Sequence, residues 1–399
     1  SMQTTEEKSG YCSSTTAPDR LPLSTANALR NWSWLGTSKS NGKKLRTCLP
    51  QIAAREVLEA PAHDNITMNI IIPMAGRGSR LRPHTLTIPK PLVPVGGKPI
   101  VERLAEDIVA MSTEKVEEIA FVIGDFGEET EQQLLQIAER LGAKGHICHQ
   151  DEPLGTAHAI LCGQQCLEGP VVVAFADTLF RADFQIDPEA DGVLFVKQVE
   201  NPSAFGVVVT NQQGAITDYV EKPESFISDL AMIGIYAFRD GARLKDELQR
   251  LIDENIIKGG EYQLPDALRN MTQAGLRFEP GAVSEWMDCG NKVATVDTNQ
   301  RILELTKNEL TLPENAIVED SLILPPCHIG AGAVIRHSVI GPHVSVGNGT
   351  VIEDSSIRNS LIQSNTTIQN KVLNGSMIGN HTTIAGKADD ISLGDYNAI

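Results

Sequence analysis

The sequence contains no apolar run that approaches 18 residues, the length that a helix needs to cross a membrane. Positive charge is scarce: 34 Lys and Arg stand against 51 Asp and Glu, and the net charge of −17 argues against a general nucleic-acid-binding protein. The seven cysteines are scattered, and Cys162 and Cys166 have no second pair at metal-ligand spacing, so a zinc site is not expected. Reduced thiols without an apolar span predict a cytoplasmic protein.

Acidic side chains are absent from residues 76–98, although the chain as a whole is acidic. An apolar run at residues 70–73 precedes this stretch and predicts a buried strand. The glycines of the stretch allow backbone N–H groups to approach phosphate oxygens, and its basic side chains supply countercharge. The stretch therefore predicts a loop that binds a polyanion. Its basic residues are Arg77, Arg80, Arg82, Lys90 and Lys98.

Two other phosphate-binding folds do not fit this loop. Gly76 and Gly78 match the start of the dinucleotide motif G-x-G-x-x-G, but Leu81 occupies the sixth position, where a glycine is needed for close helix packing. The loop then continues through several prolines, which a continuous helix does not accommodate. A P-loop is excluded because no G-K-[ST] follows the glycines.

Residues 68–305 alternate between strand and helix patterns. Helices are predicted at 101–111, 128–141, 242–252 and 262–273, and apolar strands at 118–124 and 169–176. Shorter strands are predicted at 192–197, 205–210, 215–220 and 231–238. Continuous apolar strands between helices favour a parallel sheet that is covered on both faces. We therefore predict an α/β fold: a three-layer, Rossmann-like domain with a mostly parallel sheet.

From about residue 315 apolar residues recur at steps of six, which slip repeatedly to five, with Gly, Ser, Asn and Thr between them. This period fits neither a helix nor a simple strand. It is typical of a parallel β-helix, in which each coil has three short faces and one side chain from each face packs inward. The predicted inward residues are Ile317, Ile323, Ile329, Ile335, Ile340, Val346, Ile352, Ile357, Ile362, Ile368, Leu373, Ile378 and Ile384.

The predicted organisation has five parts. Residues 1–67 are a leader without an assigned role, either flexible or a targeting presequence, although Glu6 and Glu7 argue against the latter. Met68, directly before the first strand, is the expected start of the working protein. The remaining parts are a catalytic domain at 68–305, a linker at 306–314, a β-helix at 315–386 and a tail at 387–399.

Four further motifs fit a phosphate-binding domain. Residues 150–157, QDEPLGTA, end in a small-residue turn that opens a helix, where a base can lie close to the backbone. Asp177 follows a central strand, at the end where ligands bind in open α/β sheets. Glu221 and Lys222 place an acid and a base before a proline, and Asp288 lies beside an aromatic ring.

In combination and in this order, the motifs AGRGSRLRPHT, PKPLVPV, QDEPLGTAHA, FAD, EKP and WMDCG resemble the sugar-1-phosphate nucleotidyltransferase family. Its members include glucose-1-phosphate thymidylyltransferase and the uridylyltransferase domain of the bifunctional N-acetylglucosamine-1-phosphate enzyme. The resemblance covers residues 68 to about 305. A C-terminal left-handed β-helix built from hexapeptide repeats is a frequent companion in that family.

The resemblance implies three groups of site residues. Those expected to bind the nucleotide are Ala75, Gly76, Gly78, Ser79, Gln150, Gly155 and Thr156. Those expected in catalysis are Arg80, Lys90 and Asp177, with Asp177 and Asp288 as ligands of Mg²⁺. Those expected to bind the sugar phosphate are Gly206, Glu221, Lys222 and Trp286. Some have structural alternatives: Asp177 as a strand-end cap, Asp288 as a turn residue, Glu221 and Lys222 as a solvated pair, and Trp286 as a core residue.

The implied reaction is attack of a sugar 1-phosphate, with glucose 1-phosphate the first choice, on the α-phosphate of dTTP or UTP. The products are a nucleotide-sugar and pyrophosphate. Gln150 favours a pyrimidine because an amide can pair with its O4/N3 edge. Ala75 and Ala176 stand where the family often has glycine, so the nucleotide stays open. The alternatives are the UDP-N-acetylglucosamine and GDP-mannose pyrophosphorylases.

The β-helix allows a second activity, because hexapeptide β-helices often carry acyltransferases with a histidine base. Histidines in the repeat region are His328, His337, His343 and His381. No long loop for a coenzyme is evident, so oligomerisation or control is the favoured role. The expected partners are a nucleoside triphosphate, a sugar 1-phosphate and further copies of the chain, without nucleic acid or membrane.

Overall fold

The computed structural model describes residues 67–396 except for residues 77, 183–189 and 394. The predicted leader, apart from residue 67, therefore lies outside the described residues, as do Arg77 and the last three residues of the predicted tail. Among the described residues, the helices are too short or too polar to span a membrane.

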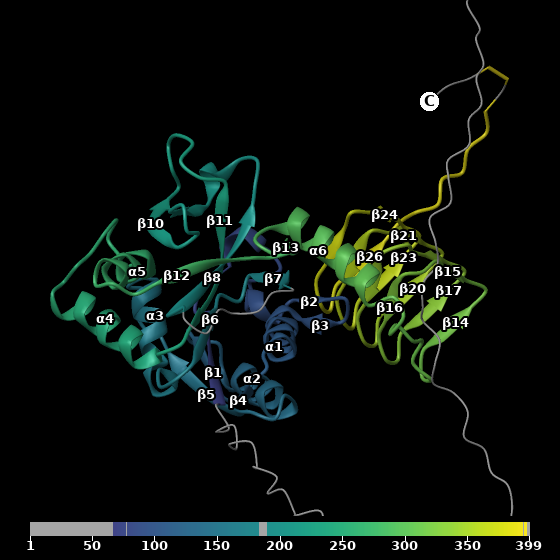
Figure 1. The fold of residues 1–399 in the computed structure, drawn as a ribbon. Coiled ribbons are helices and arrows are strands. Elements are labelled where there is room, and N and C mark those ends of the chain that lie inside the picture. Colours follow the sequence, from purple (N-terminus) through teal and green to yellow (C-terminus); the bar gives the residue numbers. More distant parts are fainter. Residues whose placement is uncertain (1–66, 77, 183–189, 394, 397–399) are drawn as a thin grey trace, which may run out of the picture. The chain divides into compact units, whose positions relative to one another are not determined.

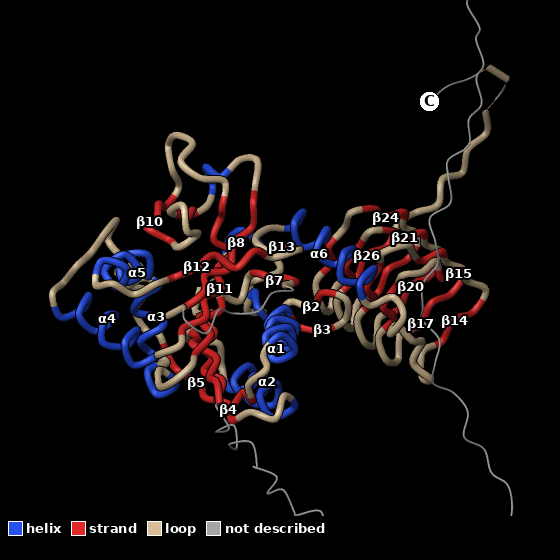
Figure 2. Tube along the Cα trace, in the orientation of Figure 1, coloured by secondary structure: helices blue, strands red, loops and turns tan. Residues whose placement is uncertain are grey.

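The first part of the described chain contains a sheet whose core is parallel (Figures 1 and 2). Strand β1 (Thr67–Pro73) lies between β4 (Lys115–Ile123) and β6 (Val171–Ala174), and β4 pairs with β5 (Lys144–His149); all three pairings are parallel. Antiparallel strands continue the sheet beyond β6: β11 (Leu230–Phe238), β9 (Gly206–Thr210) and β10 (Ile216–Glu221). Strand β8 (Gly192–Gln198) pairs with β11, and β12 (Phe278–Ala282) pairs with β8.

Helices cover both faces of this sheet. Successive side chains of β1 point to opposite faces, and because they are apolar, each face is covered by helices. Ile70 and Ile72 belong to one buried cluster with residues of α1 (Ile100–Met111) and α2 (Glu128–Arg140). Ile71 belongs to a second cluster with α3 (Thr156–Cys162), α4 (Gly241–Asp253) and α5 (Leu264–Gln273). Figure 1 shows these two sets of helices on either side of the sheet. The predicted three-layer α/β fold is confirmed.

Two short ribbons stand beside the sheet. Strands β7 (Thr178–Arg181) and β13 (Glu285–Asp288) pair antiparallel, and β2 (Pro94–Val95) pairs with β3 (Lys98–Pro99). Helix α6 (Lys292–Leu305) follows β13. The sequence predictions missed β2, β3, β5, β7, β12, β13 and α6. In α6 the buried positions include Thr295, Thr298 and Asn299, so an apolar stripe does not mark the helix.

The second part of the described chain is a stack of coils with three parallel sheets, as the β-helix prediction required. Register partners in one sheet are Ile317, Val334, Val351, Thr367 and Thr383, so each coil takes 17 or 16 residues. The strands of that sheet are β14 (Ile317–Glu319), β17 (Val334–Arg336), β20 (Val351–Glu353), β23 (Thr367–Gln369) and β26 (Thr383–Ala385). The second sheet contains β15 (Leu322–Ile323), β18 (Val339–Ile340), β21 (Ser356–Arg358) and β24 (Val372–Asn374). The third contains β16 (Cys327–Ile329), β19 (Val344–Val346), β22 (Ser360–Ile362) and β25 (Met377–Ile378).

The inward stack agrees with the predicted periodicity except at its first position. Ile335, Ile352 and Ile368 form part of the buried cluster of the β-helix. Ile317, however, is 42% exposed, and Val318 packs inward in its place. The reason is the ladder register, because Val318 pairs with Ile335 and successive side chains of a strand point to opposite faces.

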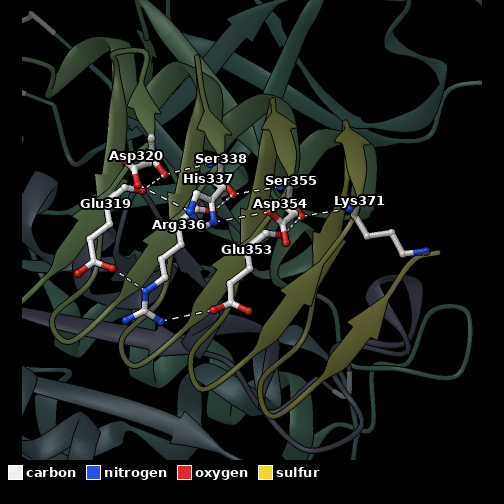
Figure 3. A network of polar contacts seen from close by, with 10 residues as sticks. Glu319, Asp320, Arg336, His337, Ser338, Glu353, Asp354, Ser355 and Lys371 are labelled. Carbon is white, nitrogen blue, oxygen red and sulfur yellow. Dashed lines mark hydrogen bonds and ion pairs between the residues drawn. The ribbon is translucent and has the colours of Figure 1, made fainter. Parts of the chain in front are cut away.

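Polar side chains stack along one corner of the coils (Figure 3). Asp320, His337 and Asp354 occupy equivalent left-handed positions with φ of +47°, and the His337 ring lies 3.7 Å from each carboxylate. One residue further on, the hydroxyl oxygen of Ser338 accepts a hydrogen bond from the backbone N–H of Ser355 in the next coil. These repeated contacts satisfy backbone donors at a corner that has no sheet ladder.

The β-helix and the α/β part share one buried interface. Leu361 and Met377 of the third β-helix sheet belong to the same buried cluster as Ile302 of α6. At its centre the side-chain oxygen of Asn299 accepts hydrogen bonds from Gly96 N at 2.8 Å and from Ser345 Oγ at 2.7 Å. Asn299 therefore joins α6, the β2–β3 ribbon and the β-helix.

Candidate active site

Residues from separate parts of the chain line one cavity of about 410 Å³, which lies at the carboxyl ends of the parallel strands. That position follows from the topology, since the parallel strands β1, β5 and β6 all end at this edge of the sheet. The predicted site residues that line the cavity are Ala75, Gly76, Gly78, Ser79, Arg80, Lys90, Gln150, Gly155, Thr156 and Asp177.

The loop after β1 is shaped by close contact between its two ends. Gly78 has a φ of +58°, and a Cβ at this position would lie 2.8 Å from Lys90 Cβ, so only glycine fits without a shift. Its carbonyl oxygen accepts a hydrogen bond from Thr85 Oγ1 at 2.8 Å. Arg80 is exposed and has no ion-pair partner within the described parts of the chain. This guanidinium is therefore available to an anion in the cavity.

Lys90 is a buried cation that faces the end of β6. Its side chain is only 8% exposed, and Nζ lies 3.1 Å from Asp177 Oδ2, whose side chain is 43% exposed. A buried ammonium group needs a partner, and Asp177 supplies it from the cavity wall. The ion pair places one positive and one negative group side by side next to the phosphate-binding loop.

Asp288 lies on the strand beside Asp177 rather than on the cavity wall. The backbone N–H of Cys289 donates to Asp177 O at 3.0 Å, which joins the two segments. Asp288 is exposed, and its Oδ1 accepts a hydrogen bond from Gly290 N at 2.7 Å, while Thr298 Oγ1 of α6 donates to its carbonyl oxygen. Burial raises the pKa of the Cys289 thiol, between the two carboxylates, to about 12, so this group stays protonated.

The donor set of Asp177 and Asp288 fits a hard divalent cation. Both groups offer carboxylate oxygens, and both are open to solvent. Two protein ligands leave room for water and phosphate oxygens, which is how Mg²⁺ is commonly held.

Gln150 enters the cavity from the end of β5 with its amide oriented by the protein. Its Nε2 donates to Gly155 O at 3.2 Å and lies 3.2 Å from His158 Nδ1. These two contacts orient the amide, and Oε1 has no hydrogen-bond donor among the residues that the structure describes. Gly155 is required by packing, because a Cβ there would lie 2.4 Å from Tyr262 O. Thr156 accepts a hydrogen bond from Leu264 N at 2.9 Å, which ties α3 to the start of α5.

Predicted sugar-binding residues lie outside the first cavity. Gly206 pairs with Glu221 across β9 and β10, and a Cβ at Gly206 would lie 2.7 Å from the Glu221 carboxylate. Lys222 has a φ of +43°, an uncommon conformation for a residue with a side chain, and Nζ lies 3.4 Å from Glu221. Glu221 and Lys222 line a second cavity of about 360 Å³.

Trp286 is partly buried and lies outside both cavities described above. Its ring meets Phe205 edge-on at a centroid distance of 4.9 Å. Its indole Nε1 is buried and makes no hydrogen bond within the described chain. Its role in binding a sugar stays a prediction.

Sequence reasoning missed Phe175 and Glu261. Phe175 lines the first cavity one position after the end of β6, within the strand predicted at 169–176. Glu261 lines both cavities and so marks where they approach each other. Its loop, at residues 254–263, carries no motif. Backbone hydrogen bonds of Tyr262 with Leu154 and Ala157 bring it to the site.

The histidines of the β-helix do not gather around one cavity. The His328 ring packs against Gly97, and burial lowers its pKa. His343 Nε2 lies 2.6 Å from Glu304 Oε1 of α6, and His337 belongs to the corner stack of Figure 3. Two of the four histidines thus contact the α/β part of the chain.

Comparison with known proteins agrees with this geometry. Residues 69–304 match the family described as Nucleotidyl transferase. The chain is 30% identical over 268 residues to the low-salt glycan biosynthesis nucleotidyltransferase Agl11 of Haloferax volcanii, covering 64% of this chain and 72% of Agl11. It is 30% identical to UTP–glucose-1-phosphate uridylyltransferase AglF of the same organism, covering 60% of this chain and 98% of AglF. The match to the bifunctional protein GlmU of Methanococcus aeolicus, at 29% identity, covers 64% of this chain but only 60% of GlmU.

A solved structure shows the same fold. The nucleoside-diphosphate-sugar pyrophosphorylase from Vibrio cholerae RC9 superposes with a TM-score of 0.50 at 22% identity, covering 58% of this chain and 99% of the other. Because the match to the family model extends over more than half of the chain, it establishes the family to which the chain belongs. The chain belongs to the nucleotidyl transferase family, and residues 69–304 are its sugar-1-phosphate nucleotidyltransferase domain.

Proposed function

We propose that the chain transfers the nucleotidyl group of UTP or dTTP to a sugar 1-phosphate, with glucose 1-phosphate as the first choice of sugar. The observation that carries the proposal is the single cavity that holds the basic loop, the Lys90–Asp177 pair and the Gln150 amide. The match to the uridylyltransferase AglF, which covers 98% of AglF and 60% of this chain, supports UTP and glucose 1-phosphate.

The mechanism needs no general base, because a sugar phosphate is already ionised at neutral pH. Its oxygen attacks the α-phosphorus in line, and pyrophosphate leaves. Catalysis then depends on positioning the two substrates and on balancing the negative charge that gathers between them. Lys90 is buried and held in place, so its charge needs no reorganisation, while exposed Arg80 can follow the departing phosphates.

A divalent cation is the general requirement of the family. We propose Mg²⁺, held by Asp177 and Asp288. When bound, the ion would neutralise phosphate oxygens and help align the attacking group. Lys90 contacts only Oδ2 of Asp177, so Oδ1 has no partner among the described residues.

The free acceptor of Gln150 supports uracil or thymine as the base. Both carry an N3–H that can donate to Gln150 Oε1, whereas cytosine and adenine present a ring nitrogen without a hydrogen at the equivalent position. Guanine does carry a ring N–H there. A GTP assay with mannose 1-phosphate is therefore needed, and one relative is the mannose-1-phosphate guanylyltransferase catalytic subunit beta of Drosophila melanogaster.

A pyrophosphate-release matrix tests this proposal. Five nucleoside triphosphates would be combined with glucose, N-acetylglucosamine and mannose 1-phosphates. We expect UTP or dTTP with glucose 1-phosphate to give the highest kcat/KM. The Gln150→Ala variant should lower kcat/KM for that pair by about 10-fold, the value of one lost hydrogen bond, and should reduce the preference over CTP.

Gln132→Ala is the matched control, because Gln132 is exposed on α2 and donates a hydrogen bond to Glu128, away from the cavity. Activity restricted to GTP and mannose 1-phosphate would contradict the argument from Gln150. High activity with N-acetylglucosamine 1-phosphate alone would keep the mechanism and change the sugar.

We also propose that the chain forms a homo-oligomer through the second sheet of the β-helix. Leu322, Val339, Ser356 and Val372 occupy equivalent outward positions on β15, β18, β21 and β24, and the three apolar side chains are 54%, 39% and 86% exposed. Three exposed apolar side chains in one column, interrupted only by the small Ser356, suit contact with a second copy.

The Val372→Glu variant should therefore dissociate the oligomer, because a carboxylate would be buried unpaired in the contact. Sedimentation velocity would give the mass. Gln369→Glu, a change at an exposed position on the first sheet, is the control and should leave the mass unchanged. An unaltered mass for Val372→Glu, or a monomeric wild type, would contradict the proposal.

A further inference from the structure

Three potential metal ligands meet at the end of the sheet opposite to the active-site cavity. Glu118 lies early in β4, His146 early in β5, and Cys166 in the short turn that precedes β6. Their ligand atoms all lie within 4.8 Å of one another. Sequence spacing gave no hint of this cluster, because its members come from three segments, and Cys162, the apparent partner of Cys166, is not one of them.

The separations of these atoms suit a tetrahedral ion. His146 Nε2 lies 3.3 Å from Glu118 Oε1, and Cys166 Sγ lies 3.7 Å from Glu118 Oε2. Zinc bonds of about 2.0–2.3 Å place neighbouring tetrahedral ligands about 3.3–3.8 Å apart. The mixture of thiolate, imidazole and carboxylate also favours zinc over Mg²⁺ or Ca²⁺, which take oxygen ligands.

The imidazole of His146 is 20% exposed, but its Nε2 atom is buried without a well-aligned hydrogen bond among the described residues. Its Nε2 is buried and, although close to Glu118 Oε1, lies in a direction that gives no hydrogen bond. A buried polar atom without a partner is costly, and native structures contain few of them. A metal ion between His146, Glu118 and Cys166 would satisfy this atom.

One cation competes for the same place. Lys144 Nζ lies 3.2 Å from Glu118 Oε1, but the Lys144 side chain is 69% exposed. An exposed ion pair of this kind contributes about 0–1 kcal/mol, so its displacement into solvent costs little. The turn that carries Cys166 is already fixed, since Asn69 Nδ2 donates to Cys166 O at 3.2 Å.

We propose that Glu118, His146 and Cys166 form a Zn²⁺ site, with water as the fourth ligand. Binding releases the thiol proton of Cys166 to solvent, because the thiolate is the form that binds metal. The ion would connect edge strand β5 to β4 and to the turn before β6. Its effect would be on stability, since His146 lies in the first half of β5, whereas Gln150 follows the end of that strand.

Cobalt titration of the full-length protein tests the site. After removal of metal with a chelator, we expect one Co²⁺ per chain to produce the absorption of a cobalt–thiolate bond, and Zn²⁺ to abolish it. The variants Cys166→Ser and His146→Gln should each lose this absorption. Cys162→Ser should keep it, as should Asp177→Asn, in which the candidate active-site ligand is changed.

Thermal unfolding provides the second measurement. Zn²⁺ should raise the Tm of the wild type and of Asp177→Asn, because a ligand that binds only the folded state stabilises it, and should not raise the Tm of Cys166→Ser or His146→Gln. Unfolding of these two variants without metal shows whether they fold. The proposal is overturned if the wild type shows no thiolate absorption, or if Cys166→Ser retains it.

Discussion

Replacing Lys90 by alanine should lower kcat by about 100-fold or more, the loss seen when one preorganised group is removed from a site that stabilises developing charge. Lys90 is suited to this role because its ammonium group is buried and fixed 3.1 Å from Asp177 at the edge of the cavity. A group held in place before the reaction needs no reorganisation when charge develops. Initial rates of pyrophosphate release at saturating substrates give the change in kcat directly.

The matched control is Lys98→Ala. Lys98 follows in the same basic stretch, but it is exposed and pairs with Glu106, so its loss should change kcat less than twofold. Thermal unfolding separates catalysis from folding, because the freed Asp177 is open to water and should cost little stability. Near-normal turnover of Lys90→Ala would remove the proposed role of the loop.

Changing Asp177 to asparagine should have a comparably large effect through the metal. We expect kcat to fall by about 100-fold and the Mg²⁺ concentration for half-maximal rate to rise, because an amide is a weaker ligand than a carboxylate. Titration of the rate with Mg²⁺ measures both. The charge-neutralising control is Asp253→Asn on the exposed face of α4, which should leave the Mg²⁺ dependence unchanged.

The double variant Lys90→Ala with Asp177→Asn distinguishes a unit from two independent groups. If Lys90 and Asp177 act together as one ion pair, kcat of the double variant should be little lower than kcat of the slower single variant. Multiplicative losses would show that the two residues act separately. An unchanged Mg²⁺ dependence in Asp177→Asn would contradict its assignment as a ligand.

Much of the site was predictable because its chemistry is local in the sequence. A loop without acidic residues, an aspartate after a buried strand and a glutamine before a small-residue turn each carry their meaning in a few neighbouring positions. The α/β alternation and the six-residue period were readable for the same reason. Ile317 was misplaced by one position because an apolar pair, Ile317 and Val318, leaves the inward residue undecided until the register is known.

Features that depend on contacts between distant segments could not be predicted. Glu261 reaches the cavity because its loop packs against Gly155 and forms hydrogen bonds with Leu154 and Ala157 through Tyr262. Helix α6 has buried polar residues, Asn299 and Thr298, at positions where an apolar stripe would have revealed it in the sequence. The Glu118, His146 and Cys166 cluster spans three segments of chain, and its members are individually unremarkable residues.

The shared interface at Asn299 has a consequence for exchanging parts between related enzymes. The Asn299 oxygen serves Gly96 and Ser345 at once, and Gly96 lies six positions after Lys90 in the chain. A chimaera that keeps the α/β part and takes a foreign β-helix would lose the Ser345 hydroxyl and the apolar cover of Leu361 and Met377. The α/β part and the β-helix therefore have to be exchanged together, or with matched residues at this junction, for a chimaera to keep the interface.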